Sequence, residues 1–397
     1  MTRGAICLVA ALLIASPAWA AGGESLFWPD FIHVFFSESL SVTGPAPGFQ
    51  LPGMKEKSQE TLTTARLILE GGAAEWHYDI HAVQAWRARA GTPYTAAPAA
   101  IERSAIFNQA QRRDDTSRAD FGLDRFSVRH SAGAVDIIAG RQAINLATCY
   151  HFTPNDFFAP FSFNSFYRAY KPGVDALRME ARLDNLTQAS LMAVAGYERD
   201  LENPGSFERS PDGGLASYLG RLSHAFQNLE VVLLGGSLRG EMVAGGAVQG
   251  ETVFNIGYRA EGHYKTTGST GYGAVSAQLE RRFENTLILR GEYFLNGAGA
   301  ASPALYDLDK PYPAREYAGL GASYEFTPLL TGETVGVINF GDGSGIISAT
   351  LVYSVGDESD LAFSGYVPWG TEPGMEGVQS QFGSLPEGVS MELRAFF

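Results

Sequence analysis

The sequence predicts an all-β fold, a transmembrane up-and-down antiparallel β-barrel of about 18 strands, with 16 as the alternative count. Three observations support this prediction. The N-terminus is typical of an exported chain, short segments along the chain alternate between apolar and polar residues, and the last such segment ends in an aromatic residue. Together these features favour a membrane barrel over a soluble β-sandwich, in which alternating segments also occur.

Residues 1–20 are expected to be a secretory signal peptide. Arg3 supplies a positive charge near the start, residues 5–15 form a short apolar run, and Ala18-Trp19-Ala20 has the small-x-small form of a cleavage site. The run is too short to span a bilayer as a helix. The alternative is an apolar anchor that stays attached, but the cleavage pattern favours removal and a barrel over residues 21–397.

The composition of the chain suits a barrel and excludes one class of partner. Its 46 glycines suit strands that curve and approach one another closely, and its aromatic content of 12% suits girdles at the two membrane interfaces. Removal of residues 1–20 would leave one cysteine, Cys149, so no intrachain disulfide is expected. The net charge of −14 argues against nucleic acid as a partner.

The C-terminal segment 389–397 is expected to be the closing strand. Its odd-numbered positions are apolar and end in Phe397, whereas Ser390, Glu392 and Arg394 occupy the other face. A free amphipathic edge would be an aggregation hazard in a soluble protein, but in a barrel it pairs with the first strand. The aromatic end resembles the feature by which outer-membrane barrels are recognised for insertion, so Phe397 is expected to bind the barrel-assembly machinery.

Alternating segments recur along the chain, and they set the strand count. The clearest are residues 174–183, 255–264, 286–295 and 347–355. Residues 229–248 are compatible with two strands joined by a tight turn near 237–241 or with one long strand, and this choice separates 18 strands from 16. Either count gives a barrel wide enough for an aqueous channel.

The last strand is expected to run from outside to periplasm. Counting back from it, the connections between strands lie alternately at the two ends of the barrel. Periplasmic turns are expected near residues 71–72, 131–133, 184–185, 227–228, 249–250, 284–285, 327–328 and 357–359. Long external loops are expected at residues 44–59, 89–118, 144–172, 297–314 and 366–388.

The polar strand faces are assigned to the lumen because of the cost of the alternative. An arginine that faces lipid at mid-depth costs about 2–4 kcal/mol, and one that faces water costs little. The expected pore-lining residues are Arg125, Arg129, Arg178, Glu180, Arg182, Arg221, Arg259, Glu261, Arg282, Arg290 and Glu292, joined on the same argument by Arg66, Asp79, Glu280 and Glu325. The arginines would form a ladder for carboxylated or phosphorylated solutes, or would pair with the glutamates and only fix the barrel's shape.

The loop at residues 144–172 is unusually rich in phenylalanine. Because such a loop is poorly suited to water, it is predicted to fold into the barrel mouth, bury its rings and narrow the channel. The predicted constriction comprises Asn155, Asp156, Phe157 and Phe158, with Asn155 and Asp156 facing the solute. The alternative is a cap on the rim or on a neighbouring protomer.

The same region carries a resemblance to a known family. The stretches Gly140-Arg141-Gln142, Pro154 to Phe161 and Tyr170 to Arg178 resemble a signature of alginate-export-like outer-membrane porins of proteobacteria. The resemblance implies a monomeric barrel of about 18 strands with an arginine-lined lumen, and it does not imply alginate as the solute. Arg141 departs from the pattern, because alternation from Ile137 directs it toward lipid; a bulge or a position above the membrane is expected there.

These observations favour an outer-membrane channel through which small polar solutes diffuse, and the hypothesis extends to anionic solutes. The alternatives are a polysaccharide-export barrel that works with periplasmic partners and a plugged barrel with a structural or enzymatic role. The expected partners are membrane lipid, a small polar solute and the assembly machinery. The protein is expected to be a monomer.

No enzymatic activity is predicted. The sequence has no Gly-x-Ser-x-Gly elbow, no phosphate-binding loop and no Cys-x-x-Cys-His haem site. His77, Asp79 and His81 share one strand face, a spacing that could bind a metal or hold a catalytic base. Pore lining is the preferred interpretation of these histidines, so neither a metal nor another cofactor is predicted.

Overall fold

The computed structural model describes residues 28–45, 57–91, 102–114, 116–160, 170–198, 211–308, 310–375 and 377–397. The expected signal peptide, residues 1–20, lies outside the described residues, as do residues 46–56, 92–101 and 161–169 and the single residues 115, 309 and 376 of the expected loops. Among the described residues, no helix is long and apolar enough to cross a membrane.

Antiparallel strands make up nearly all of the regular structure. The strands are β1 (Phe31–Thr43), β2 (Ser58–Ala73), β3 (Trp76–Ala90), β4 (Asn108–Arg113), β5 (Ser117–Ala132), β6 (Val135–Gln142), β7 (Val174–Arg182), β8 (Thr187–Gly196), β9 (Asp212–Ala225), β10 (Leu229–Leu238), β11 (Glu241–Glu251), β12 (Ile256–Thr267), β13 (Thr270–Arg282), β14 (Ile288–Asn296), β15 (Glu316–Thr327), β16 (Leu330–Asn339), β17 (Gly345–Gly356), β18 (Ser359–Trp369) and β19 (Gly388–Phe396). Three short 3₁₀ helices, η1 (Ala105–Phe107), η2 (Pro303–Leu305) and η3 (Phe382–Ser384), lie between them.

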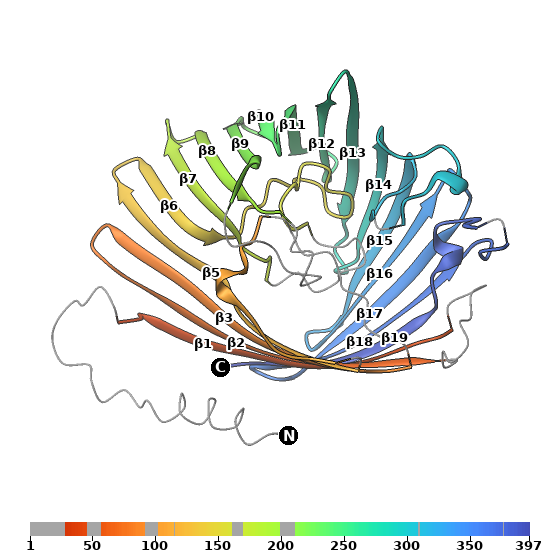
Figure 1. The fold of residues 1–397 in the computed structure, drawn as a ribbon. Helices are drawn as coiled ribbons and strands as arrows, with labels where there is room; N and C mark the ends of the chain where they lie inside the picture. Colours follow the sequence, from red (N-terminus) through yellow and green to blue (C-terminus); the bar gives the residue numbers. More distant parts are fainter. Residues whose placement is uncertain are drawn as a thin grey trace.

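The strands form a closed ring in chain order (Figure 1). The ring closes where β1 pairs antiparallel with β19, from Phe35 opposite Phe396 to Thr43 opposite Gly388. Short β4 is an addition to the ring, because β3 pairs directly with β5 while β4 pairs with the part of β5 beyond the end of β6. The sheet of 19 strands without β4 is a barrel of 18, which confirms the predicted fold class and the larger of the two predicted counts.

Residues 229–248 contain two strands, as the larger count requires. β10 and β11 are joined by Arg239 and Gly240 alone, and both have positive φ, 53° and 81°. This is the backbone conformation of a type I′ hairpin turn, whose twist matches that of the two strands it joins. Glycine adopts positive φ without strain, which explains its place in so tight a turn.

The two ends of the barrel differ in the length of their connections. At one end the connections are short, for example residues 133–134, 328–329 and 357–358. The expected turns lie at or near these connections. The turns expected near 71–72 and 249–250 are displaced because β2 continues to Ala73 and β11 continues to Glu251 before the chain turns. The long connections, including residues 143–173, lie at the other end.

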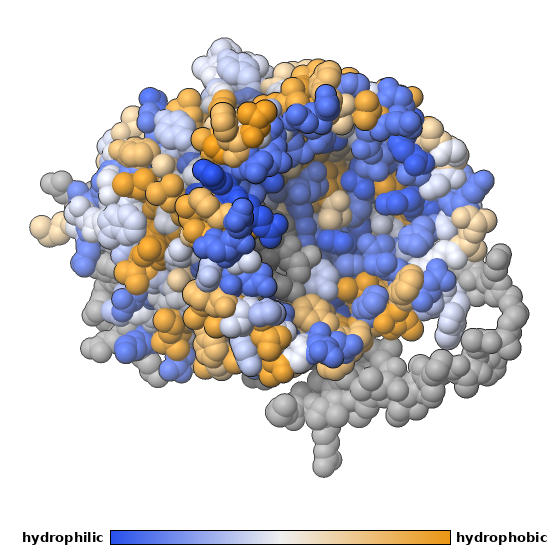
Figure 2. All heavy atoms as spheres, turned by 180° about the vertical axis from the view of Figure 1, so that it is seen from behind, coloured by the Kyte–Doolittle hydropathy of each residue, from blue (hydrophilic) through white to orange (hydrophobic). Residues whose placement is uncertain are grey.

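The outer and inner faces of the barrel follow the alternation along each strand. In β14, Leu289, Tyr293 and Leu295 are exposed, whereas Glu292 and Phe294 between them are buried. Figure 2 shows hydrophilic residues gathered in the hollow of the barrel and hydrophobic residues spread over the outer surface. An exposed apolar belt around a closed sheet is the arrangement of a transmembrane barrel, because lipid covers the belt and the backbone leaves no open edge.

Candidate functional site

The phenylalanine-rich loop lies inside the ring of strands, where residues 143–160 cross the lumen after β6 (Figure 1). Phe152 and Phe158 are almost completely buried. Phe158 packs in an apolar cluster with the inner faces of β7 to β11, and Phe152 packs in a second cluster against β13 to β17. Most other lumen-facing strand positions are polar. These two clusters are therefore the apolar surfaces of the inner wall against which the loop packs.

Between these two apolar clusters, carboxylates on the barrel wall accept hydrogen bonds from the backbone of the loop. Glu261 on β12 accepts hydrogen bonds from the N–H groups of Thr148, Cys149 (2.8 Å) and Asn155 (3.0 Å). Glu292 on β14 accepts from the N–H groups of two further loop residues, His151 (2.8 Å) and Phe152 (2.6 Å). An irregular segment has no strand partner for its backbone, so wall carboxylates satisfy these groups instead.

Asn155 and Asp156 have a different role from the one expected. Asn155 is fully buried, its amide donates to the carbonyl of Gly246 (3.0 Å), and its Oδ1 lies 3.2 Å from Nδ1 of His263. Asp156 is also buried and forms an ion pair with Lys171. Neither side chain is presented to a solute: Asn155 holds the loop to the wall, and Asp156 joins two parts of the loop. Burial lowers the pKa of the Lys171 ammonium, and the adjacent Asp156 carboxylate opposes that effect.

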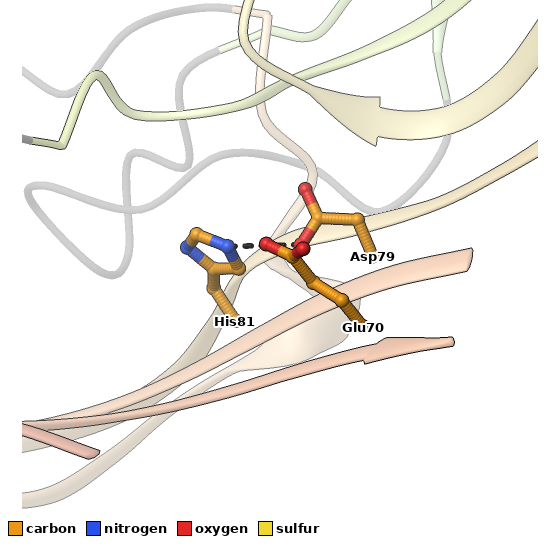
Figure 3. A group of neighbouring side chains, drawn as sticks. All are labelled: Glu70, Asp79 and His81. Atoms are coloured by element: carbon orange, nitrogen blue, oxygen red, sulfur yellow. Dashed lines mark ion pairs between the residues drawn. The ribbon is translucent and has the colours of Figure 1, made fainter. Parts of the chain in front are cut away.

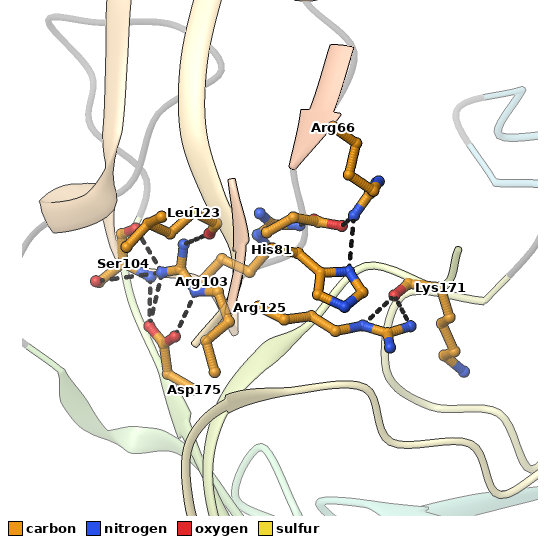
Figure 4. Close-up of polar contacts among 10 residues, drawn as sticks. Arg66, His81, Arg103, Ser104, Leu123, Arg125, Lys171 and Asp175 are labelled. Carbon is orange, nitrogen blue, oxygen red and sulfur yellow. Dashed lines mark hydrogen bonds and ion pairs between the residues drawn. The ribbon is translucent and has the colours of Figure 1, made fainter. Parts of the chain in front are cut away.

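A cluster of charged residues lines the wall formed by β2, β3 and β5 (Figure 4). Arg66 donates to Asp124 (2.7 Å) and to Nδ1 of His81 (3.2 Å), and Arg103 donates to the second oxygen of Asp124 (2.9 Å). Arg125, a predicted pore-lining residue, donates to the carbonyl of Lys171 (2.9 Å). This wall therefore contacts the C-terminal part of the loop, while the wall from β11 to β14 holds its N-terminal part.

The other predicted pore-lining arginines divide into paired and unpaired groups. Arg178 lies 3.4 Å from Glu180, Arg221 lies 3.8 Å from Glu230, and Arg290 lies 2.5 Å from Glu280. Arg182 is exposed and donates to the carbonyl of Gly133. In contrast, three arginines form no ion pair with any residue that the structure describes: Arg129, Arg259 and Arg282. Both of the arrangements expected from the sequence, cross-strand pairing and free cations, therefore occur.

Two of the unpaired arginines border a common cavity. Arg259 and Arg282 line a space of about 390 Å³ together with Gln249, Gln278 and Glu280. Its lining includes two guanidinium groups and, with Asn255, three amides, which are donors suited to carboxylate or phosphate oxygens. It also includes two carboxylates, those of Glu251 and Glu280, and the Glu280 carboxylate is engaged by Arg290.

Arg141 is enclosed on the outward side of the barrel wall. Its register with β5 is continuous, so no bulge occurs in that pairing, and it lies one residue before the end of β6. Its guanidinium binds Asp175 (2.6 Å), the carbonyl of Leu123 (2.9 Å) and the carbonyl of Ser104 (3.0 Å). The segment that contains Ser104 and Phe107 covers it, and the Phe107 ring centre is 5.6 Å from the guanidinium carbon.

Glu70, Asp79 and His81 form a group that could be taken for a metal site (Figure 3). Their ligand atoms lie within 4.8 Å of one another. Arg66 can only donate a hydrogen bond, so Nδ1 of His81 accepts it and Nε2 carries the proton toward Asp79, 2.9 Å away. This tautomer leaves no nitrogen lone pair for a metal, and the group is better described as a chain of polar contacts from Arg66 through His81 to Asp79. His77 is exposed and lies outside the group.

Comparison with known proteins was informative for structures alone, since no family model and no curated protein matches the chain. A BenF-like porin from Pseudomonas fluorescens Pf-5 superposes with a TM-score of 0.60 at 9% identity, over 93% of this chain and 99% of the other. The outer membrane protein opdK from Pseudomonas aeruginosa gives 0.58 at 9% identity, over 93% and 100%. OccAB3 from Acinetobacter baumannii gives 0.57 at 10% identity, over 92% and 98%.

The fold is that of an outer-membrane porin. At 9–10% identity the likeness concerns the fold alone. None of the three porins named here is described as an alginate-export-like protein, so that narrower resemblance stays a prediction. The likeness extends over almost the whole length of each porin, which agrees with a complete ring of strands in this chain.

Two residues of the barrel lumen, Glu70 and Gln278, were not identified from the sequence. Glu70 joins Asp79 and His81 only through the pairing of β2 with β3, in which it stands directly opposite Asp79. Gln278 accepts the N–H of Tyr150 (2.8 Å), and His263 contacts Asn155. Alternation along residues 255–264 already places His263 on the polar face with Arg259 and Glu261, and the same signal in β13 could have placed Gln278 in the lumen.

Proposed function

We propose that the protein is a monomeric outer-membrane porin that lets small polar solutes, anions among them, diffuse through its lumen. One observation carries the proposal: an irregular loop is fastened inside a closed barrel whose inner face is polar. In this role residues 144–160 are the constriction, and Arg129, Arg259 and Arg282 supply positive charge that no described carboxylate neutralises. The fold shared with a BenF-like porin supports the same function.

A plugged barrel is the second candidate, because the loop contacts both the β11 to β14 wall and, through Lys171, the β5 wall. Planar-bilayer recording of residues 21–397 under a salt gradient separates the two functions. Discrete conductance steps with a reversal potential on the anion side are expected. A folded barrel without conductance would overturn the porin proposal in favour of the plugged barrel.

Arginine variants test the expected anion preference. Replacing Arg178 and Arg182 together with alanine should lower the ratio of anion to cation permeability, since both carry lumen charge. The pair Arg259→Gln and Arg282→Gln should lower it further, because these arginines have no carboxylate partner among the described residues.

The matched control for the arginine variants is Arg281→Ala. Arg281 alternates with Arg282 along β13 and lies on the outward face, so the substitution removes one arginine charge, half of that removed in each double variant, without changing the lumen. The readout is the reversal potential. An unchanged reversal potential in both double variants would contradict the arginine ladder while leaving the porin proposal intact.

Phe397 is proposed to act in barrel assembly. Its backbone N–H and carbonyl each bond to Val34 at 2.8 Å, but its side chain is 63% exposed. Phe397→Ala should therefore lower the amount of barrel assembled in Gram-negative cells and leave the unfolding midpoint of the refolded protein unchanged. An equal loss of stability in the refolded protein would instead assign the ring a structural role, and normal assembly in cells would contradict recognition.

A further inference from the structure

Two buried carboxylates in the lumen bind the same loop. Glu261 is 2% exposed and Glu292 is 4% exposed, and together they accept hydrogen bonds from five backbone N–H groups between Thr148 and Asn155. A carboxylate buried in this way would be costly without such donors, and hydrogen bonds to a charged acceptor are stronger than neutral ones. The loop N–H groups therefore replace the water that the two carboxylates lose on burial. In return, the carboxylates hold the loop against the wall.

The sheet register fixes the positions of these acceptors. Glu261 stands opposite Ser276, and Gln278 stands opposite Glu292, so three adjacent strands present a polar grid to the loop. Ser276 donates to Glu292 (2.8 Å), which orients the carboxylate, and Gln278 accepts the N–H of Tyr150. Because β12, β13 and β14 are continuous strands of the wall, the grid is rigid compared with the loop it holds.

We propose that Glu261 and Glu292 are positioning residues that set the width of the channel by fastening the constriction loop to the wall. The inference rests on the proposed function, since it concerns the same lumen. The proposal also changes the role expected for these two residues from the sequence. Because backbone N–H groups enclose their carboxylates, Glu261 and Glu292 do not act as free negative charges that attract cations into the pore. Lumen selectivity is then governed by the unpaired arginines.

Cys149 is a natural reporter for the position of the loop. Its N–H binds Glu261, its thiol lies 3.8 Å from the carbonyl of Ser276, and its side chain is buried. Burial, followed by the charges of Glu292 and Glu261, raises the pKa of the thiol to about 12. The sequence has one other cysteine, Cys7, so Cys149 is the only thiol in residues 21–397. Release of the loop would expose the thiol and return its pKa toward the ordinary value.

Glutamine variants test the proposal. Glu261→Gln and Glu292→Gln keep the shape of the side chain but replace one acceptor oxygen with an NH₂ group that opposes the loop N–H donors. We expect a larger unitary conductance in planar bilayers and an alkylation rate of Cys149 at least about tenfold above that of the wild type. In the wild type the alkylation rate should still rise at about pH 10, whereas in the variants it should level off at lower pH.

Glu230→Gln is the matched control, because it removes one negative charge from the lumen at a residue that binds Gln249 (2.6 Å) and Arg221 rather than the loop. It should match the wild type in both conductance and alkylation. Wild-type behaviour of both Glu261→Gln and Glu292→Gln would overturn the proposal, as would an equal response to Glu230→Gln. If Glu261→Gln does not fold, Glu261→Asp withdraws the carboxylate by one methylene and should give a smaller increase in both readouts.

The two readouts separate this proposal from the proposed function. If the folded wild type has no conductance, the porin function fails, but the alkylation rates still report whether the two carboxylates hold the loop. If the wild type conducts and the variants are alkylated at the wild-type rate, the porin function stands and the positioning role of the two glutamates is wrong.

Discussion

Replacing Arg141 with alanine is expected to lower the free energy of unfolding by about 3–5 kcal/mol, because it removes a buried cation and leaves the partly buried Asp175 carboxylate without its partner. Arg141 is 1% exposed, and both of its terminal nitrogens and its Nε are bonded: to Asp175 (2.6 and 3.1 Å), Leu123 and Ser104. Asp175 also accepts the N–H of Ser104 (2.8 Å). The guanidinium thus connects β5, β6, β7 and the segment before β4.

Urea unfolding of the refolded barrel in lipid vesicles measures this effect. Arg282→Ala is the control, since Arg282 is exposed and unpaired with described residues, and it should change the free energy of unfolding by no more than about 0.5 kcal/mol. The double variant Arg141→Met with Asp175→Leu should be less destabilised than Arg141→Ala, because it removes both charges. A loss below about 1 kcal/mol for Arg141→Ala would show that the ion pair is dispensable.

Removing the two buried rings of the constriction loop is expected to open the channel. Phe152→Ala and Phe158→Ala each remove a ring from an apolar cluster, a change that costs about 3–5 kcal/mol in a packed core. Here the lost packing free energy weakens the attachment of the loop to the inner wall, whereas the hydrogen bonds between the strands stay in place. The double variant should form a folded barrel with a larger unitary conductance.

Ion selectivity is the second readout for this double variant. It changes no charge, so the reversal potential should stay on the anion side while the conductance rises. Phe363→Ala is the control, because Phe363 is exposed on the outer face and should leave the conductance unchanged. Wild-type conductance in the double variant would mean that the loop does not limit the passage of ions.

Sequence alternation accounted for the barrel itself, because a wall between lipid and water imposes a period of two on every strand. It assigned Glu292 to the inner face and Leu289 to the outer. For residues 229–248 it left two strands and one long strand as alternatives, and the structure has two strands joined by Arg239 and Gly240. Strand ends were displaced where polar or small residues continue into the strand, as at the end of β2 near Ala73.

Contacts between distant segments could not be predicted in the same way. Glu261 and Glu292 read as ordinary lumen charges, since nothing near them in the sequence indicates that a loop more than 100 residues away supplies their donors. Arg141 was directed outward correctly by alternation, but the segment that covers it belongs to the connection between β3 and β5. Asn155 was taken as a contact for solute because a loop residue shows no periodicity from which burial could be inferred.

The long sequence separation of the loop from its anchors has a consequence for the order of events in biogenesis. The loop follows β6, yet the groups it binds on Gly246, Glu261 and Glu292 lie 91 to 141 residues further along the chain. Contacts of such high separation form late. We therefore expect a newly made barrel to pass through a stage in which Phe152 and Phe158 are still in water, and the loop to reach its final position only after β11 to β14 are in place.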